Sequence, residues 1–391
     1  MTARGSHPVL ADSPYVGYVY AYPHKTAYRP LAPTPLAGVW AGEPRDRLSL
    51  YVHVPFCTMR CGFCNLFTTA NPAASLMPPY LDALRRQAEA VRAAVPDARF
   101  AQFAIGGGTP TYLTEAELET VFDLAETVMG VDPASVGTSV EASPDTLSAG
   151  KVALLAGRNV ERVSLGVQSF VDAEVRQSGR SQSRAEVEAA LGLLIGRFPT
   201  VNVDLIYGLP EQTVESWLES VRIAAAFGPE ELYLYPLYVR PLTGLGKSAK
   251  RWDDWRLSCY REARALLLDA GYRQVSMRMF RKGTDPKTNP VYCCQVDGMI
   301  GLGSGARSYA RELHYSFEYA VAAGGVRGII ADYLARRPEE FARADYGFEL
   351  DGDERRRRYL LQSVLNADGL DVSRYRVTFG TAPTDDFPDL L

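Results

Sequence analysis

Residues 51–67 read YVHVPFCTMRCGFCNLF, a short β-branched run that leads into three closely spaced cysteines. Cys57, Cys61 and Cys64 follow a strand expected at 48–54, in a C-x-x-x-C-x-x-C pattern. A loop with this spacing can bring three thiolates onto one side of an inorganic iron–sulfur cube. The pattern therefore predicts a four-iron, four-sulfur cluster (4Fe–4S) with three protein ligands and one open iron.

A structural zinc ion is the alternative for the same cysteines. Such zinc sites take four protein ligands. His53 lies within the expected strand and Asn65 follows Cys64, so no fourth ligand stands beside the motif. We therefore expect an iron–sulfur cluster rather than zinc.

Six expected strands alternate along the chain with stretches of helical length. Capping-box pairs mark two helix starts, at Thr114 with Glu117 and at Ser183 with Glu186. The alternation predicts an α/β fold, a partial (β/α)6 TIM-like barrel with a smaller C-terminal α+β region, and places the chemistry at the carboxyl ends of the strands. The expected strands lie at 48–54, 99–105, 136–142, 160–167, 201–207 and 231–237.

Three regions follow from this pattern. Residues 1–47 are rich in proline and aromatic residues without a helical or strand period, which predicts an N-terminal wrapping arm. Residues 48–250 form the expected partial barrel. Residues 251–391 are less regular and predict a smaller C-terminal region, with helices expected at 253–270 and 352–366.

Composition narrows the classes of protein. The 391 residues carry a formal net charge of -4, which provides no basic field to attract nucleic acid. The chain shows neither an apolar leader segment at its start nor a run of about 18 apolar residues. We therefore expect a cytoplasmic protein that has neither a membrane nor a nucleic acid as partner.

The other cysteines stand far from the motif. Cys259 is expected to pack within a helix. Cys293 and Cys294 are adjacent, and neighbouring side chains diverge in an extended chain, so the two cannot readily share one metal ion. We interpret them as small buried side chains, with an additional cluster or a reactive thiol as the alternative.

The cysteine motif, with Phe63 directly before its third cysteine, resembles that of the radical S-adenosylmethionine (SAM) superfamily. Further segments follow in the order seen in the oxygen-independent coproporphyrinogen III oxidases and the related haem chaperones, and they cover most of 48–310. These segments are IGGGTPTYL (105–113), EASPDTL (141–147), RVSLGVQSF (162–170), DLIYGLP (204–210) and GLGSGARSY (301–309).

The resemblance implies the cofactors and their chemistry. In this superfamily the amino and carboxylate groups of SAM chelate the open iron, and reduction of the cluster splits SAM into methionine and a 5′-deoxyadenosyl radical that abstracts hydrogen. A low-potential electron donor such as flavodoxin or ferredoxin is implied as a partner. One SAM molecule is implied, or two if the segment GLGSGARSY folds over a second ligand.

The resemblance also implies residues that contact SAM. Gly106, Gly107 and Gly108, which end the second expected strand, offer their backbone to the aminoacyl end of SAM, and Glu141 accepts hydrogen bonds from the ribose hydroxyls. Arg180 pairs with the SAM carboxylate. The alternative for Arg180 and Asp204 is a salt bridge within the barrel. Tyr51 lines the substrate side or belongs to the core. The implied cofactor-binding set is Tyr51, Phe63, Gly107, Gly108, Thr109, Glu141, Gln168, Arg180 and Asp204.

The chain departs from the family pattern downstream of these segments. Leu66 stands where the oxidases usually carry a further cysteine, and residues 288–293 lack the histidine and tryptophan of the haem chaperones. Arg307 replaces a histidine, and Arg278 lies in a second altered stretch, 275–281. Either arginine can bind a carboxylate or phosphate of the substrate, or close a salt bridge. The chain also ends sooner after GLDVSRYRVTFG (369–380) than relatives with a small winged-helix-like domain, which predicts an incomplete lid.

These observations predict a radical SAM enzyme that abstracts hydrogen from a small anionic metabolite, with the three cysteines, Arg278 and Arg307 as its reactive and substrate-binding residues. A radical methyltransferase that uses two SAM molecules and an oxygen-independent coproporphyrinogen III oxidase are alternatives within the class. A haem-binding chaperone without turnover is the alternative outside it, and the absent histidine and tryptophan argue against it.

Overall fold

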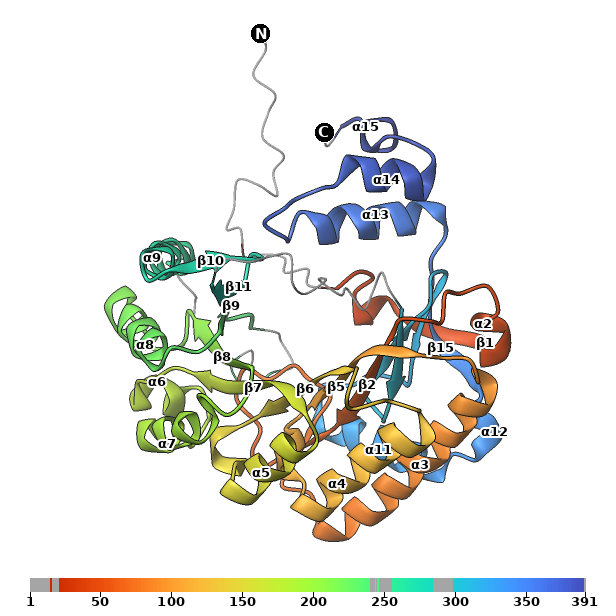
Figure 1. Ribbon diagram of the computed structural model, residues 1–391, viewed down its shortest axis with the longest axis horizontal. Coiled ribbons are helices and arrows are strands. Elements are labelled where there is room, and N and C mark those ends of the chain that lie inside the picture. The colour runs from red at the N-terminus through yellow and green to blue at the C-terminus, as the bar shows by residue number, and fades with distance from the viewer. Residues whose placement is uncertain are drawn as a thin grey trace.

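Parallel strands form the middle of one curved sheet. The computed structural model describes residues 21–239, 255–283 and 298–389, together with Tyr15, Thr243 and Leu245. Within these residues the sheet has 13 strands in the order β1-β15-β14-β13-β12-β2-β5-β6-β7-β8-β9-β11-β10. The strands from β2 to β9 in this order run parallel and make the arc seen in Figure 1: β2 (Leu48–Val54), β5 (Phe100–Gly107), β6 (Gly137–Ala142), β7 (Val160–Gln168), β8 (Thr200–Tyr207) and β9 (Glu231–Pro236).

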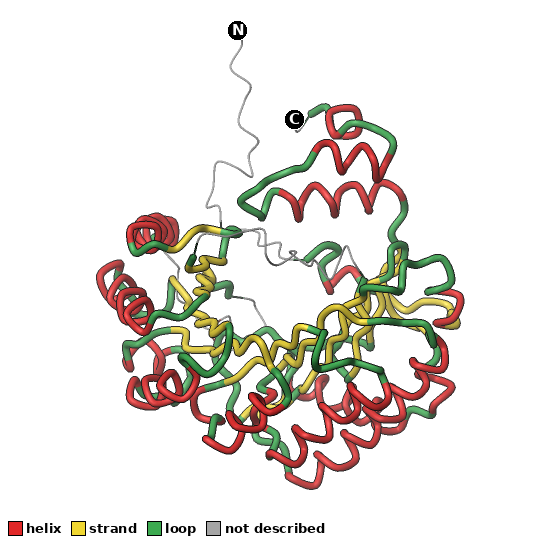
Figure 2. Tube along the Cα trace, viewed as in Figure 1, coloured by secondary structure: helices red, strands yellow, loops and turns green. Residues whose placement is uncertain are grey.

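Helices cover the outer, convex side of this arc (Figure 2). All but α9, which follows the last parallel strand and precedes β10, lie between successive parallel strands, as right-handed βα units require. In chain order these helices are α3 (Met77–Ala94), α4 (Glu115–Asp123), α5 (Ala149–Gly157), α6 (Asp172–Gln177), α7 (Arg184–Leu194), α8 (Val214–Phe227) and α9 (Arg256–Asp269).

Strand side chains alternate between the helices and the inside of the arc. On β2, Leu50 and Val52 are fully buried, whereas Tyr51 faces inward to the cavity described below. On β8, Val203 is fully buried in the apolar core and Asp204 lines the same cavity. The apolar set holds the helices against the sheet, so the inner face is left for polar residues.

The six predicted strands are confirmed, each within two residues of its expected ends. Both predicted capping boxes are also present, at Thr114 with Glu117 and at Ser183 with Glu186. The helices expected at 253–270 and 352–366 are α9 and α13 (Gly352–Ser363). Cys259 is fully buried in the core, as expected for a packing residue.

Part of the N-terminal region forms a strand that the sequence pattern did not indicate. Arg29–Pro35 form β1, which pairs antiparallel with β15 (Arg343–Glu349) at one edge of the sheet. Proline removes a backbone donor, and an edge strand needs no partner on its outer side, so the prolines hid this strand from the sequence pattern without preventing it. The short helix α2 (Leu36–Val39) follows, and the buried Trp40 donates a hydrogen bond from Nε1 to the Tyr315 hydroxyl at 3.0 Å.

Strands from the C-terminal third extend the sheet at both of its ends. β12 (Met299–Leu302) runs parallel to β2 and is followed by β13 (Arg307–Tyr309) and β14 (Leu313–Ser316). β11 (Met279–Lys282) and β10 (Tyr272–Gln274) continue the sheet beyond β9. Two short strands, β3 (Phe56–Cys57) and β4 (Thr69–Ala70), pair separately.

The remaining helices lie beyond the parallel arc. Figure 1 shows α13, α14 (Val372–Phe379) and α15 (Pro383–Asp386) on its open side, and α11 (Ala323–Ala335) and α12 (Pro338–Phe341) near α3. The loop after α13 is joined to the sheet side by the amide of Met277, which donates to the carbonyl of Leu365 at 2.8 Å. The altered stretch at 288–293, which includes Cys293, and the adjacent Cys294 lie outside the described residues.

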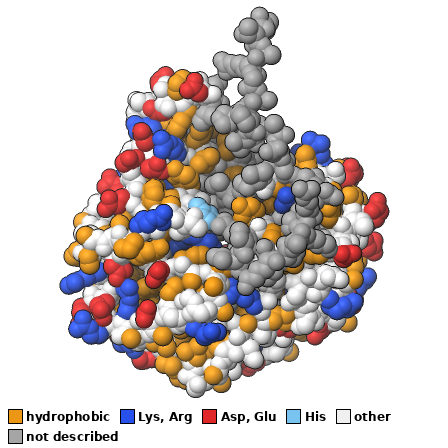
Figure 3. All heavy atoms as spheres, turned by 180° about the vertical axis from the view of Figure 1, so that it is seen from behind, with side chains coloured by type: hydrophobic (Ala, Val, Ile, Leu, Met, Phe, Trp, Pro, Cys, Tyr) orange, Lys and Arg blue, Asp and Glu red, His pale blue; other side chains and the backbone are white. Residues whose placement is uncertain are grey.

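Two features of the surface bear on function. Among the described residues, no helix is both long and apolar enough to cross a bilayer. On the described part of the face in Figure 3, acidic and basic side chains are interspersed and form no large patch of a single sign.

Candidate active site

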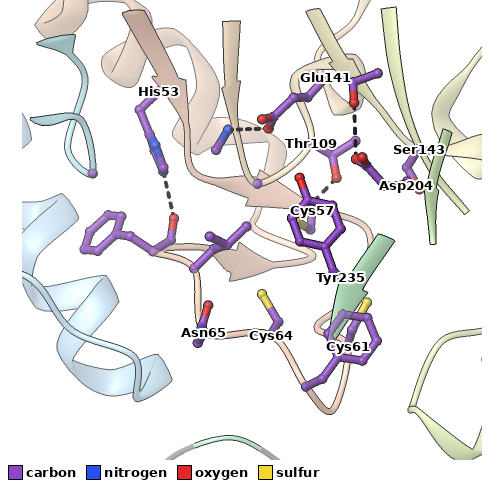
Figure 4. Close-up of a pocket in the computed structure, with 18 of the residues that line it drawn as sticks. His53, Cys57, Cys61, Cys64, Asn65, Thr109, Glu141, Ser143, Asp204 and Tyr235 are labelled. Atoms are coloured by element: carbon purple, nitrogen blue, oxygen red, sulfur yellow. Dashed lines mark hydrogen bonds between the residues drawn. The ribbon is translucent and has the colours of Figure 1, made fainter. Parts of the chain in front are cut away.

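A cavity of about 640 Å³ lies inside the arc, where the parallel strands end. Every residue that the sequence singled out for the site lines it. The list is Cys57, Cys61, Cys64, Tyr51, Phe63, Gly107, Gly108, Thr109, Glu141, Gln168, Arg180, Asp204, Arg278 and Arg307. Figure 4 shows the three cysteines on one loop, with Glu141 and Asp204 on the strands above them.

The loop that carries the cysteines, residues 57–66, is called the cluster loop below. Its middle is fixed by backbone hydrogen bonds to other elements: the amide of Gly62 donates to the carbonyl of Ser178 at 2.7 Å, and the carbonyl of Gly62 accepts from Leu245 at 2.9 Å. The amide of Cys64 also donates to the carbonyl of Cys61 at 3.0 Å. The loop is therefore a defined structure that holds all three sulfurs against one cavity.

Polar groups approach two of the three sulfurs. The Cys57 sulfur lies 3.1 Å from the Thr68 hydroxyl and 3.5 Å from that of Thr109. Nη1 of Arg180 donates toward the Cys61 sulfur at 3.6 Å. Three thiols that line one cavity, two of them with such donors, suit a thiolate-bound cluster, because these contacts stabilise negative charge on sulfur.

Two of the three thiols have raised pKa values, so they stay protonated unless a metal binds them. Burial raises the pKa of Cys57, and it raises the pKa of Cys64 to about 12. Bonding to iron would offset this cost, because coordinated thiols lose their protons. In the part of the chain that the structure describes, no three His, Cys, Asp or Glu side chains gather around one position that could hold a single metal ion.

The glycine turn after β5 is required by close packing. Gly107 has φ +118°, and a Cβ there would come within 2.7 Å of the His53 ring. A Cβ on Gly106 would meet the Glu141 carboxylate at 2.8 Å. Only glycine permits this approach of backbone to side chain.

The amides of this turn have partners within the protein. Gly107 donates to Glu141 Oε2 at 3.0 Å, Gly108 to the Val54 carbonyl at 2.8 Å, and Thr109 to the Phe56 carbonyl at 2.8 Å. The turn was expected to offer its polar backbone groups to a ligand. The structure instead uses these three amides to fix the turn and to orient Glu141.

Two carboxylates face the inside of the barrel. Burial, together with a smaller contribution from the nearby Asp204, raises the pKa of Glu141 to about 7. Burial also raises the pKa of Asp204, whose oxygens accept from Ser164 at 3.1 Å and Asn202 at 2.8 Å. Glu141 is exposed to the cavity that it lines, so a ligand can reach its carboxylate.

Arg180 is held in place by several acceptors. Its Nη2 donates to Ser143 Oγ at 2.9 Å and to the Gly166 carbonyl at 2.6 Å, and its Nε donates to Gln182 at 2.6 Å. The ion pair of the barrel interior is formed by other residues, since Nε of Arg162 contacts Glu231 at 2.8 Å. The guanidinium is thus oriented at the cavity wall beside Cys61.

Gln168 adopts a backbone conformation that is rare outside glycine. Its φ is +71°, and the pairing of β7 with β8 shifts register between Gly166 and Gln168. Such conformations persist where the surrounding structure imposes them, which is common at functional sites. The bulge at this strand end aims the Gln168 side chain at the cavity.

Tyr51 belongs to the cavity wall. Burial lowers the pKa of the neighbouring His53 to about 4, so this ring is neutral. Nε2 of His53 lies 2.9 Å from the Phe67 carbonyl and carries the proton, which leaves Nδ1 to accept from the Tyr51 hydroxyl at 3.1 Å. His53 therefore orients Tyr51 at the cavity.

The two predicted substrate arginines approach the cavity from opposite ends of the sheet. Arg278 directly precedes β11, and its guanidinium lies 5.4 Å from the Tyr235 ring centroid. Arg307 begins β13, with its guanidinium 5.8 Å from the Tyr309 ring centroid. Both line the same cavity as the cysteines.

Sequence reasoning missed several residues of the site. The Thr58 hydroxyl donates to Asp145 at 2.6 Å and that of Ser143 donates to Asp145 at 2.5 Å, which links the cluster loop to the Arg180 network. Ser143 and Asp145 both lie in EASPDTL (141–147), so the segment itself was a signal. Lys25 also lines the cavity, and no motif marks it.

Comparisons with known proteins agree with this geometry. Residues 51–224 match the family described as the radical SAM superfamily. The chain is 30% identical over 273 residues to the heme chaperone HemW of Bacillus subtilis, covering 67% of this chain and 70% of that protein. It is 30% identical over 277 residues to the oxygen-independent coproporphyrinogen III oxidase of Paracoccus denitrificans, covering 68% and 60%. The structure of the Escherichia coli coproporphyrinogen III oxidase HemN matches with a TM-score of 0.81 at 24% identity, covering 95% of this chain and 88% of that one.

Proposed function

Because this chain belongs to the HemN/HemW-like family of radical SAM enzymes, we propose that it abstracts hydrogen from a small anionic substrate. Its cofactors are a 4Fe–4S cluster and SAM. When bound, they supply a 5′-deoxyadenosyl radical by reductive cleavage of SAM. In the proposal, a low-potential donor of the flavodoxin or ferredoxin type provides the electron, and the cytoplasm is the compartment because it keeps free thiols reduced.

The observation that carries the proposal is one cavity lined jointly by three cysteines, an acid pair and three arginines. In the proposal Cys57, Cys61 and Cys64 hold the cluster. Arg180, oriented beside Cys61, pairs with the SAM carboxylate, because a guanidinium and a carboxylate form strong charge-assisted hydrogen bonds. These residues would hold SAM in one orientation next to the cluster.

The rest of the barrel wall is assigned to the remainder of SAM. Glu141 and Asp204 accept hydrogen bonds from its hydroxyl groups, and Gln168 contacts its ribose or methionyl part. The turn at Gly107 and Gly108 keeps its position beside the cavity because a side chain at either residue would meet His53 or Phe56. Tyr51 then lies between the cofactor side and the substrate side.

Arg278 and Arg307 are assigned to the substrate. Both are cations at any physiological pH, and both line the cavity. An anionic group of the substrate would be fixed by one of them or by both. The walls of the barrel exclude water, which protects a reactive intermediate from quenching.

The test of this proposal is an anaerobic turnover experiment. The reconstituted, reduced enzyme is incubated with SAM and either coproporphyrinogen III or a library of small carboxylates and phosphates, and products are identified by mass spectrometry. We expect 5′-deoxyadenosine formation to rise with an anionic metabolite and no conversion of coproporphyrinogen III, because Leu66 and Arg307 depart from the oxidase pattern. Efficient formation of protoporphyrinogen would replace our proposal with the oxidase function.

Isotope labelling separates hydrogen abstraction from methyl transfer. SAM with a deuterated methyl group is supplied during turnover. Transfer of the label into the substrate, together with S-adenosylhomocysteine, would identify a methyltransferase that uses two SAM molecules. We expect 5′-deoxyadenosine and methionine without label in the substrate.

A further inference from the structure

One backbone carbonyl of the cluster loop has two side-chain donors from distant parts of the chain. The carbonyl oxygen of Asn65 accepts from Nζ of Lys25 at 2.9 Å and also from the hydroxyl of Tyr319. Asn65 directly follows Cys64, as Figure 4 shows. The two donors therefore act on the peptide next to the third cysteine of the motif.

The two donors also contact each other. Nζ of Lys25 donates to the Tyr319 hydroxyl and lies 3.8 Å from the centroid of the Tyr319 ring. We call Lys25, Tyr319 and the Asn65 carbonyl the loop latch. An ammonium over an aromatic face is attracted by the ring, so the contact adds to the hydrogen bonds.

Burial makes the latch dependent on all three of its parts. Lys25 is only 6% exposed, and a buried ammonium is costly unless it has hydrogen-bond partners. If the cluster loop moved, the ammonium would lose the Asn65 carbonyl and part of its compensation. The buried charge of Lys25 therefore favours the observed position of the cluster loop.

A second contact joins the same two segments. Nη2 of Arg60, within the cluster loop, donates to the carbonyl of Val321, two residues after Tyr319. The segment 319–321 thus holds the cluster loop on both sides of its last two cysteines. Lys25 itself lies in a short 3-10 turn, Lys25–Ala27, that is followed by the fully buried Tyr28. The latch is therefore anchored on packed structure at each end.

We propose that Lys25 is a positioning residue of the cluster loop. Through the Asn65 carbonyl it fixes the backbone beside Cys64, and with it the place of the third sulfur. This inference rests on the proposed role of the cysteines as cluster ligands. It assigns to the N-terminal segment a part in the active site, although that segment lies outside the parallel barrel.

The first test needs no cluster. Hydrogen exchange is measured by mass spectrometry on the metal-free full chain as the unchanged protein, Lys25→Met and Tyr319→Phe. We expect amides of residues 62–66 to exchange about fivefold faster in both variants, because loss of a buried hydrogen bond favours local opening. Tyr319→Phe removes only a hydroxyl, so it remains informative if Lys25→Met folds poorly.

Arg92→Met is the matched control. Arg92 also donates to a backbone carbonyl, that of Ala98, at 2.8 Å, but at the other end of the barrel. Its removal should leave exchange at 62–66 unchanged. Unchanged exchange in Lys25→Met and Tyr319→Phe would overturn the proposal, and so would equal acceleration in Arg92→Met, since that would show general loosening.

The second test follows the cluster. We expect Lys25→Met to release iron to a chelator about fivefold faster after reconstitution and to alter the electron paramagnetic resonance signal of the reduced, SAM-bound cluster. Lys25→Arg retains the charge and the donor and should restore both properties. Failure of the unchanged protein to assemble a cluster would contradict the proposed function, whereas the exchange experiment decides the latch independently.

Discussion

The two sides of the cavity differ in how their functional residues are held. On the side of the cluster, Arg180 and Asp204 each have several named hydrogen-bond partners on long parallel strands or the loops that follow them. Arg278 and Arg307 instead adjoin short strands, β11 and β13, that extend the sheet beyond the parallel arc. In the proposed function, the central barrel orients the cofactor, and the residues at the ends of the sheet adapt the cavity to a substrate.

The same division runs through the sequence. The family-like segments between 105 and 210 supply the cluster side, while the departures at 275–281 and at Arg307 lie on the other side. A common radical chemistry needs the first set, because the geometry of SAM does not change. The second set can vary with the substrate. Four predictions test this contrast, beginning with the largest effect.

Replacing Cys57, Cys61 and Cys64 together by alanine should abolish the cluster and all SAM cleavage, because no thiolate remains to bind iron. Iron and sulfide analysis and the visible charge-transfer absorbance measure the loss. Cys259→Ala is the control, since Cys259 is buried in the core away from the cavity. A full complement of cluster in the triple variant would show that other residues hold the iron.

Arg180→Met should weaken SAM binding about 10- to 100-fold, because a charged hydrogen bond contributes about 1.5–3 kcal/mol. Anaerobic equilibrium dialysis with labelled SAM measures the dissociation constant. Arg184→Met serves as the control, because Arg184 pairs with Glu188 on the surface at 2.7 Å. Unchanged affinity in Arg180→Met would assign Arg180 a purely structural role.

SAM affinity should increase with pH through the titration of Glu141. Burial raises its pKa to about 7, so the carboxylate is mostly protonated below that value and mostly ionised above it. Only the ionised form offers all its lone pairs to hydroxyl donors. We expect affinity to rise about tenfold from about pH 6 to pH 8, and Glu141→Gln to remove this dependence. An unaltered pH profile in Glu141→Gln would exclude Glu141 as its source.

Arg307→Met is expected to change SAM affinity least among these variants. SAM affinity should stay within about twofold of the unchanged protein, because sites without shared partners behave independently. Stimulation of SAM cleavage by an anionic substrate should fall in the same variant. A loss of SAM affinity as large as that of Arg180→Met would remove the distinction between the two sides.

Much of the barrel could be predicted because its information is local. Strand alternation and capping boxes lie within short windows of sequence, and site residues in the regular part of a parallel strand face inward by simple alternation. Gln168, at the bulge of β7, is the exception. Tyr51, Glu141 and Asp204 all follow this rule. Their placement required only the strand positions and the family-like segments.

Residues whose role depends on distant partners could not be predicted in this way. Lys25 meets Asn65 across 40 positions and Tyr319 across 294, and neither pairing leaves a local pattern. β1 was hidden because its edge position tolerates prolines, and its partner β15 lies at the opposite end of the chain. The interpretation of Cys293 and Cys294 stays a prediction.

The central claim is that the cavity cleaves SAM at a cluster held by the cysteine motif. The most direct measurement is chromatography of the nucleosides formed when the anaerobically reconstituted, reduced protein is given SAM. We predict 5′-deoxyadenosine and methionine in equal amounts from the unchanged protein, and neither from the triple cysteine variant. A protein that holds its full cluster and binds SAM, yet forms no 5′-deoxyadenosine with any reductant or anionic substrate, would contradict the account.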